Sequence, residues 1–291
     1  MPQPPDVPLD TGNTAFVLLC TALVLLMTPG LAIFYAGMVR AKSSLAMLMQ
    51  VFTCIGVVSV TWVLLGYSLA FGEDVGAGLL GDLRFAGGRD LDAAVPGLDL
   101  SVPPVLFATF QMMFAVLTVA LIAGAIADRV RFGAFVGFAT LWSVLVYAPL
   151  AHWVFSPSGW MARFGVLDFA GGLVVEVNCG AAGLADVVGV HFVGGVVGML
   201  FLGLLASAAV NPVVADEGLL LGGGLTQLGR QAVGVLAATA FSFTTSWVIA
   251  KAVDRVLPWR VSEDEEQAGL DQALHAETAY DFGSVRTMGR R

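Results

Sequence analysis

Charged residues are scarce in this sequence, and two long stretches contain none. Only 12% of the 291 residues are Asp, Glu, Lys or Arg, whereas 57% are hydrophobic and the mean hydropathy is +0.85. The stretches 43–72 and 100–127 carry no charge, and each exceeds the roughly 20 apolar residues that span a bilayer. A soluble globular chain is therefore excluded, because most of its surface would have to be apolar too.

Motifs of enzyme and cofactor chemistry are also missing. The sequence has no Walker A, HExxH or CxxC motif, which leaves ATP-driven transport and metal chemistry without support. A GxGxxG pattern at 76–81 follows a membrane span instead of opening a βαβ unit. The three cysteines, Cys20, Cys54 and Cys179, lack metal-ligand spacing, and we expect them to be packing residues. We predict a protein that is not an enzyme and binds no cofactor or metal.

Seven apolar stretches predict an all-α polytopic membrane protein. The first follows an N-terminal segment without basic residues, which is typical of a retained helix and not of a cleaved signal peptide. The predicted spans are 13–36, 44–70, 103–127, 132–155, 168–185, 187–207 and 231–257.

Basic residues between the spans orient the chain, because short cytoplasmic loops accumulate Lys and Arg. They follow the first and third spans and mark the end of the last, all on one side if every stretch crosses. We therefore predict an extracellular N-terminus (1–12), a membrane domain (13–257) and a cytoplasmic tail (258–291). The orienting residues are Arg40, Lys42, Arg129, Arg131, Lys251, Arg255 and Arg260.

The net charge of -8 comes largely from one external loop and from the tail, where residues 263–266 are all acidic. This balance disfavours nucleic-acid binding. A solvated tail is the simplest interpretation of the acidic run, and a docking surface for a partner is the alternative.

Two ionisable side chains, Glu176 and His191, lie deep within apolar sequence and only fifteen positions apart. Such residues are costly in a membrane, so a conduction or binding site is the default interpretation. A third, His152, lies near the external end of the fourth span. There we expect an interfacial or packing histidine.

Glycine is abundant, with 35 residues, and two GxxxG patterns occur at 133–137 and 194–198. This pattern lets helix backbones approach closely. The neighbouring helix could belong to this chain or to another subunit.

Several segments together resemble the ammonium transporter family (Amt/Mep/Rh). The similarity covers nearly the whole chain and extends into the tail. The matching segments are 27–40 (MTPGLAIFYAGMVR), 110–132, 168–172 (DFAGG), 186–195 (DVVGVHFVGG), 265–271 (EEQAGLD) and 275–280 (HAETAY).

The resemblance implies an ammonium-transporter-like helical bundle that forms a homotrimer, with a narrow hydrophobic pore in each subunit. By position, Phe110 and Phe114 match the outer vestibule and gate, and Phe155 stands where the family usually has a vestibule tryptophan. Aromatic faces hold a cation by about 0.5–2 kcal/mol. Asp168 matches an acid near the recruitment site, and it need not touch the ion if it caps the fifth helix.

Two facing histidines at mid-membrane are implied for the family pore. His191 matches the second, whereas Glu176 replaces the first. A carboxylate beside an imidazole could form a hydrogen-bonded acid–base pair. Such a pair lets ammonia and its proton be handled separately, because imidazole titrates near neutral pH.

The largest departure from the family is an internal deletion at 185/186, where the similarity passes from the fifth family helix to the tenth. About seven spans then replace eleven, and the loss of an even number preserves topology. A continuous helix would put Glu176 and His191 about 22 Å apart, whereas a tight turn within 180–189 would bring them together. We interpret their nearness in sequence as evidence of deletion rather than of contact.

The sequence thus predicts an ammonium or ammonia transporter or channel, embedded in the cell membrane. A non-conducting remnant is one alternative. Another is an ammonium sensor whose tail couples to a PII-type signalling protein. We expect a homotrimer if assembly survives the deletion.

Overall fold

The computed structural model describes residues 8–183 and 188–280, and these residues form helices and two isolated β-bridges but no strand. Five helices are long and apolar enough to cross a membrane. They coincide with five of the seven predicted spans, and the all-helical class is confirmed. The first and last of these helices are α1 (Thr11–Met38) and α10 (Thr226–Asp254), and the third comprises α4 (Pro104–Ile122) and η4 (Ala123–Ile126). The second comprises η1 (Ala41–Ser43), α2 (Ser44–Thr61), η2 (Trp62–Gly66) and α3 (Tyr67–Phe71). The fourth comprises α5 (Phe132–Trp142), η5 (Ser143–Tyr147), α6 (Ala148–Phe155) and α7 (Trp160–Phe164).

The other two predicted spans form a helical hairpin. Its first arm comprises η6 (Gly172–Val177) and α8 (Asn178–Gly183), and its second arm comprises η7 (Val188–Phe192) and α9 (Val193–Leu205). The two segments of the first arm have six residues each, so its described part is about 18 Å long. That is shorter than the roughly 30 Å of a bilayer core. The predicted deletion junction at 185/186 lies outside the described residues.

The two arms run antiparallel with their backbones in close contact. A Cβ atom on Gly172 would lie 2.7 Å from the Sδ of Met199, and one on Gly195 would lie 2.8 Å from the Cβ of Glu176. The residue numbers of the first arm increase from Gly172 to Glu176 while those of their contacts in the second arm decrease from Met199 to Gly195, so the arms are antiparallel. Only glycine fits at Gly195 without moving the opposite arm.

The GxxxG glycines do not make this contact. A Cβ on Gly194 or Gly198 would meet no described atom within 4 Å, and the same holds for Gly133. Gly137 would have only ordinary side-chain contacts. The close approach uses Gly195 instead, one position away from the pattern, because that glycine is on the helix face toward the first arm.

Aromatic side chains form the centre of the main core. Tyr67, Phe71, Trp142 and Tyr147 are all buried. Trp62 lies among them, with its ring 6.0 Å from that of Tyr147 in an edge-on arrangement. This packing joins the α2–α3 helix to the α5–α6 helix beneath the hairpin.

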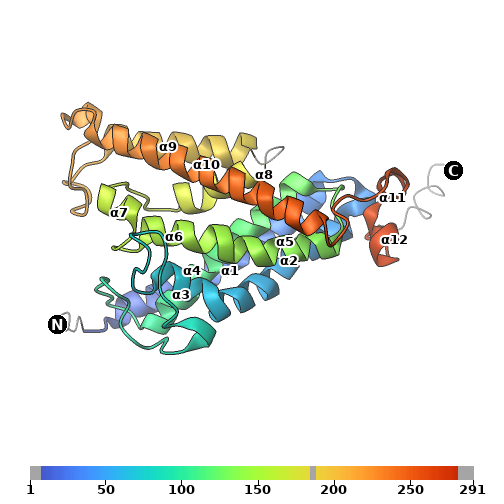
Figure 1. Ribbon diagram of the computed structural model, residues 1–291, viewed down its shortest axis with the longest axis horizontal. Helices are drawn as coiled ribbons and strands as arrows, with labels where there is room; N and C mark the ends of the chain where they lie inside the picture. Colours follow the sequence, from blue (N-terminus) through green and yellow to red (C-terminus); the bar gives the residue numbers. More distant parts are fainter. Residues whose placement is uncertain (1–7, 184–187, 281–291) are drawn as a thin grey trace, which may run out of the picture.

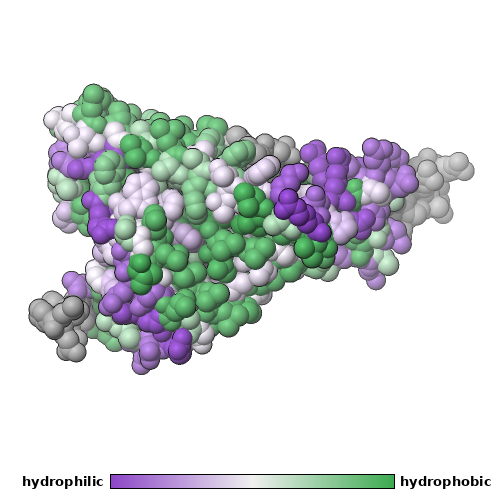
Figure 2. Space-filling view, viewed as in Figure 1, coloured by the Kyte–Doolittle hydropathy of each residue, from purple (hydrophilic) through white to green (hydrophobic). Residues whose placement is uncertain are grey.

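The long axis of the molecule separates two polar ends. Figure 1 shows the N-terminal end of α1 and the loop 72–103 near one end, and the tail helices near the other. Figure 2 shows hydrophilic residues concentrated at those ends, with hydrophobic residues over much of the surface between them. The arrangement is that of a helical bundle with an apolar middle.

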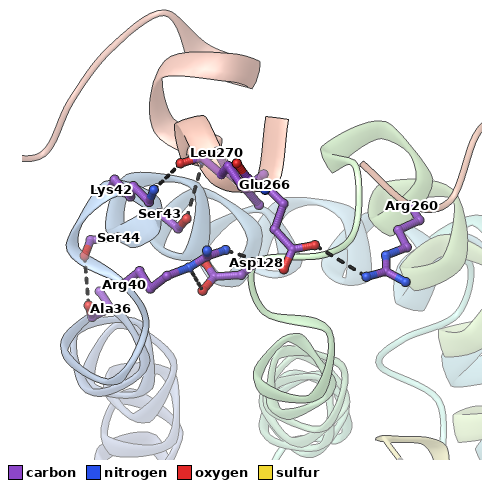
Figure 3. Close-up of polar contacts among 10 residues, drawn as sticks. Ala36, Arg40, Lys42, Ser43, Ser44, Asp128, Arg260, Glu266 and Leu270 are labelled. Atoms are coloured by element: carbon purple, nitrogen blue, oxygen red, sulfur yellow. Dashed lines mark hydrogen bonds and ion pairs between the residues drawn. The ribbon is translucent and has the colours of Figure 1, made fainter. Parts of the chain in front are cut away.

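Ion pairs gather the predicted cytoplasmic segments at one end (Figure 3). Arg40, which follows α1, lies 3.0 Å from Asp128 and 3.8 Å from Glu266 in α11 (Glu263–Ala268). Arg260 approaches the second oxygen of Glu266 at 3.4 Å. Basic residues far apart in the sequence therefore do lie at one end, and an acid of the tail bridges two of them.

The tail also caps a membrane helix. Asp271, in α12 (Leu270–His275), accepts hydrogen bonds from the backbone N–H groups of Leu45 at 3.1 Å and Ala46 at 2.8 Å. Its side chain is completely buried. A carboxylate at the start of α2 satisfies orphan donors and interacts favourably with the helix dipole.

Glu265 fixes the acidic run in place. It forms a capping box with Ser262 and an ion pair with Arg131 at 2.7 Å. The hydrogen bonds from the Ser262 backbone and hydroxyl, together with the guanidinium of Arg131, lower the pKa of Glu265. The second half of the acidic run, Glu265 and Glu266, is thus paired with basic residues of the chain, whereas Glu263 and Asp264 are exposed.

Candidate functional site

Asp168 lies just before the first arm and caps it. Its carboxylate accepts backbone hydrogen bonds from Gly172 at 2.7 Å, Leu173 at 2.9 Å and Val174 at 3.2 Å. Backbone N–H groups in a first helical turn have no partner within the helix, so these bonds define where the arm begins. The geometry is the capping arrangement that we expected from the sequence.

Glu176 and His191 meet across the hairpin. The Nδ1 atom of His191 lies 2.5 Å from the Oε2 atom of Glu176, a short hydrogen-bond distance. Of the two geometries that the sequence left open, the structure has the antiparallel one. Our interpretation that the two residues are near in sequence but not in contact is therefore wrong: Glu176 and His191 are in contact. Both residues lie in π-helical turns, a distortion that is frequent at functional sites.

The Glu176–His191 pair is not sealed within the chain. The Glu176 side chain is 35% exposed and that of His191 is 19% exposed. His191 also borders a cavity of about 370 Å³ between α1, α2, η4 and the second arm, and its lining includes Tyr35, Met47 and Gly124. The pair therefore has an apolar cavity on one side and an incomplete wall on another.

Phe110 and Phe114 form a second pair, one turn apart on α4. Their rings are 4.9 Å apart and nearly perpendicular. The helix that carries them packs against both segments of the first arm. Phe155 is half-buried against the main core at the end of α6, and no ring contact joins it to Phe110 or Phe114 among the described residues. The structure thus brings together two pairs of predicted site residues.

Cys179 is a neighbour that our sequence analysis did not connect with the site. Its sulfur, a carboxylate oxygen of Glu176 and a ring nitrogen of His191 all lie within 4.8 Å of one another. The spacing of Glu176 and Cys179, three residues apart on one helix, puts them on the same face. That spacing was the signal available in the sequence.

Asn178 is a second residue that we missed. It is completely buried, and its Oδ1 atom accepts a hydrogen bond of 2.6 Å from the hydroxyl of Ser242 in α10. Its amide also donates to the carbonyl of Val174 at 3.1 Å. The bond to Ser242 fixes the first arm to α10, whereas the bond to Val174 lies within the arm. A polar residue two positions from Glu176 within an apolar stretch could have indicated such an anchor.

His152 has a packing environment. Its side chain is completely buried, with Nδ1 2.9 Å from the carbonyl oxygen of Ala70. Its Nε2 atom lies 3.5 Å from a carboxylate oxygen of Asp74. His152 therefore links α6 to α3 and to the start of the 72–103 loop.

The family model and the similar sequences point to the same family. The model of the Ammonium Transporter Family matches residues 15–186 and 185–280, two stretches that meet where the sequence predicts missing helices. An ammonium transporter of Mycobacterium bovis is 31% identical over 433 aligned positions, which cover 94% of this chain and 91% of the relative. Because this chain has 291 residues, at least 142 of the 433 positions have no counterpart in it.

Solved structures share the fold. Mep2 of Candida albicans matches with a TM-score of 0.81 and 23% identity, over 88% of each chain. A structure described as a sensor Amt protein matches with a TM-score of 0.78 and 19% identity, over 90% of this chain and 97% of that one. The helices of this chain thus have an arrangement that is also found in these solved structures.

Proposed function

This chain belongs to the ammonium transporter family, and on that premise we propose that it moves ammonium or ammonia across the cell membrane past the Glu176–His191 pair. The relatives carry the name of transporters and not of enzymes, in agreement with the prediction that this chain is not an enzyme. The observation that carries the proposal is the 2.5 Å contact between Glu176 and His191. It supplies an acid–base pair where the resemblance expects two histidines.

Aromatic side chains provide the entry in this proposal. The π faces of Phe110 and Phe114 attract the cation by about 0.5–2 kcal/mol, and neither competes for its hydrogen bonds. Phe155 adds a π face but has no indole N–H, so we expect weaker recruitment than a tryptophan would give. The ion then reaches the apolar first arm, where a dehydrated charge is costly.

The Glu176–His191 pair avoids this cost by taking the proton from ammonium, so that only neutral ammonia enters the apolar region. Ammonium gives a proton to the neutral imidazole of His191, and the Glu176 carboxylate stabilises the resulting imidazolium. Neutral ammonia then crosses the apolar cavity beside His191. The imidazolium of His191 then gives its proton to water on the side where the ammonia leaves, which regenerates the neutral imidazole.

We propose an extracellular N-terminus and a cytoplasmic tail. Five long helices cross, while the hairpin enters and returns on the outer side, so the two termini lie on opposite sides as in the seven-span prediction. We further propose that the neighbouring subunit of a homotrimer covers the exposed side of Glu176. An uncovered carboxylate facing lipid would be several kcal/mol less stable.

Methylammonium uptake in yeast cells without their own ammonium transporters tests the proposal. We expect uptake by the wild-type chain, and its loss in His191→Ala and Phe114→Ala at equal membrane expression. Glu176→His, which restores the pair expected for the family, should keep uptake and shift its pH dependence. Phe52→Ala is the matched control for Phe114→Ala, because Phe52 is 45% exposed on α2.

Two results would overturn the transport proposal. The first is no uptake by a well-expressed wild-type protein, which would identify a non-conducting remnant. The second is unchanged uptake in both His191→Ala and Phe114→Ala, which would mean that the substrate passes elsewhere.

A sensor function is the second candidate, and the docked tail favours it. Asp271 connects the tail to the start of α2, so a partner that binds the tail could act on the bundle. Here we expect a PII-type protein to bind the purified chain and to lose binding when residues 262–291 are removed. Full binding to the shortened chain would exclude the tail as the docking element.

A further inference from the structure

The hairpin brings three different metal-binding side chains together. Glu176 and Cys179 come from the first arm and His191 from the second, and one ligand atom of each lies within 4.8 Å of the others. We propose that these side chains form a binding site for one divalent transition-metal ion, with Zn²⁺ as the ion that fits best. Our sequence analysis expected no metal, because the cysteines showed no ligand spacing of their own.

The donor types determine the class of metal. Carboxylate oxygen, thiolate sulfur and imidazole nitrogen are the three kinds of ligand that proteins use for Zn²⁺. Ca²⁺ and Mg²⁺ prefer oxygen ligands alone, so a site with one oxygen does not suit them. Three protein ligands leave the fourth tetrahedral position open for water or another small ligand.

The distances require only local adjustment. Zinc binds these donors at about 2.0–2.3 Å, which puts neighbouring donors of a tetrahedral site about 3.5 Å apart. The observed limit of 4.8 Å is about 1.3 Å larger, a difference that we expect rotation of the Glu176 and His191 side chains to close. Metal binding would replace their 2.5 Å hydrogen bond, because both groups would turn toward the ion.

The backbone supports the site from two directions. Asp168 fixes the start of the first arm through three backbone hydrogen bonds. Asn178, adjacent to Cys179, is tied to Ser242 at 2.6 Å. Glu176, Cys179 and His191 are the one group of three metal-binding side chains within residues 8–183 and 188–280 whose ligand atoms are close enough together to share an ion.

An ion at this site would link the two arms and occupy the proposed transport pair. We therefore expect Zn²⁺ to raise the thermal stability of the protein and to block uptake. Stabilisation follows because the ligand binds the folded hairpin and not the separated arms. The block rests on the proposed transport function, whereas metal binding itself does not.

Cobalt substitution tests the site directly in the purified full-length protein in detergent. One Co²⁺ per chain should bind and give a thiolate-to-cobalt charge-transfer band, and excess Zn²⁺ should remove it. Cys179→Ser should lose the band, whereas Cys54→Ala should keep it, because Cys54 is buried between other helices. Glu176→Gln should weaken Co²⁺ binding by at least about 10-fold.

The outcomes separate the metal site from the transport function. Absence of the band in the wild-type protein, or an unchanged band in Cys179→Ser, would overturn the metal site whatever the uptake result. A band with the expected losses but no uptake would overturn transport alone. If Cys179→Ser does not fold, the wild-type melting temperature still decides: it should rise with Zn²⁺, fall back with a chelator and remain unchanged with Mg²⁺.

Discussion

The two arms of the hairpin carry one residue each of the same pair, but their surroundings differ. In the first arm, Leu173, Val174 and Val177 are completely buried. In the second arm, Val190 is 72% exposed and Phe201 is 54% exposed. The first arm is a core element, whereas the second is a surface element that touches the core along one narrow face.

The packing partners explain this difference. The first arm lies against α4, α6 and α10, while the second lies against the first arm, α10 and the short turn η8 (Leu219–Leu221). We infer that the helices missing at 185/186 would have packed on the second arm. The first arm therefore forms a wall of the candidate site that is packed on its outer side, whereas the wall formed by the second arm is exposed.

A substitution at Gly195 should have the largest effect on the contact between the two arms. Gly195→Val places a side chain 2.8 Å or less from the first arm, so the arms must separate. We expect a loss of about 3 kcal/mol in the free energy of unfolding, as for overpacked cores. SDS-induced unfolding in mixed micelles measures this value.

Gly198→Val is the matched control, on the same helix but with no described atom within 4 Å. Its free energy of unfolding should stay within about 0.5 kcal/mol of wild type. Equal losses in the two variants would mean that the second arm is buried on both faces, and the contrast between the arms would fail.

The anchor of the first arm should give the next largest effect. Asn178→Ala leaves the buried hydroxyl of Ser242 without its 2.6 Å partner, and we expect a loss of about 2 kcal/mol. Ser242→Ala should cost a similar amount. The double variant should cost clearly less than the sum, because neither partner is then left unsatisfied.

Thr244→Ala provides the control on α10, since Thr244 is exposed and a change of at most about 0.5 kcal/mol is expected. Strict additivity of Asn178→Ala and Ser242→Ala would show that the two residues act independently, and their hydrogen bond would then not be the anchor of the first arm on α10.

Hydropathy was sufficient to predict the five long helices. It also singled out Glu176 and His191, two side chains that the structure brings into contact. Hydropathy could not decide between a continuous helix and a hairpin, because the sequence 180–189 is rich in glycine and alanine and its pattern is compatible with a helix as well. The capping role of Asp168 could be predicted, since a carboxylate before a helix satisfies free N–H groups. Such local chemistry depends on neighbouring residues in the chain.

Contacts that depend on tertiary structure were harder to predict. Cys179 joins the site only because the second arm folds back over it. The GxxxG pattern at 194–198 did not identify the glycine that contacts the first arm, because the orientation of the second arm was unknown. Gly195 makes the contact instead. Residue spacing identifies a helix face, but the neighbour of that face is decided by the fold.

Truncation of one valine in each arm gives the smallest and most direct comparison. Val177 is completely buried and Val197 is 48% exposed. Val177→Ala should lower the free energy of unfolding by about 1.5 kcal/mol, because lost packing contacts leave a cavity. Val197→Ala should change it by at most about 0.5 kcal/mol, since detergent or lipid replaces the lost contacts. The same SDS titration compares them, and a larger loss for Val197→Ala would indicate that a neighbouring subunit already covers the second arm.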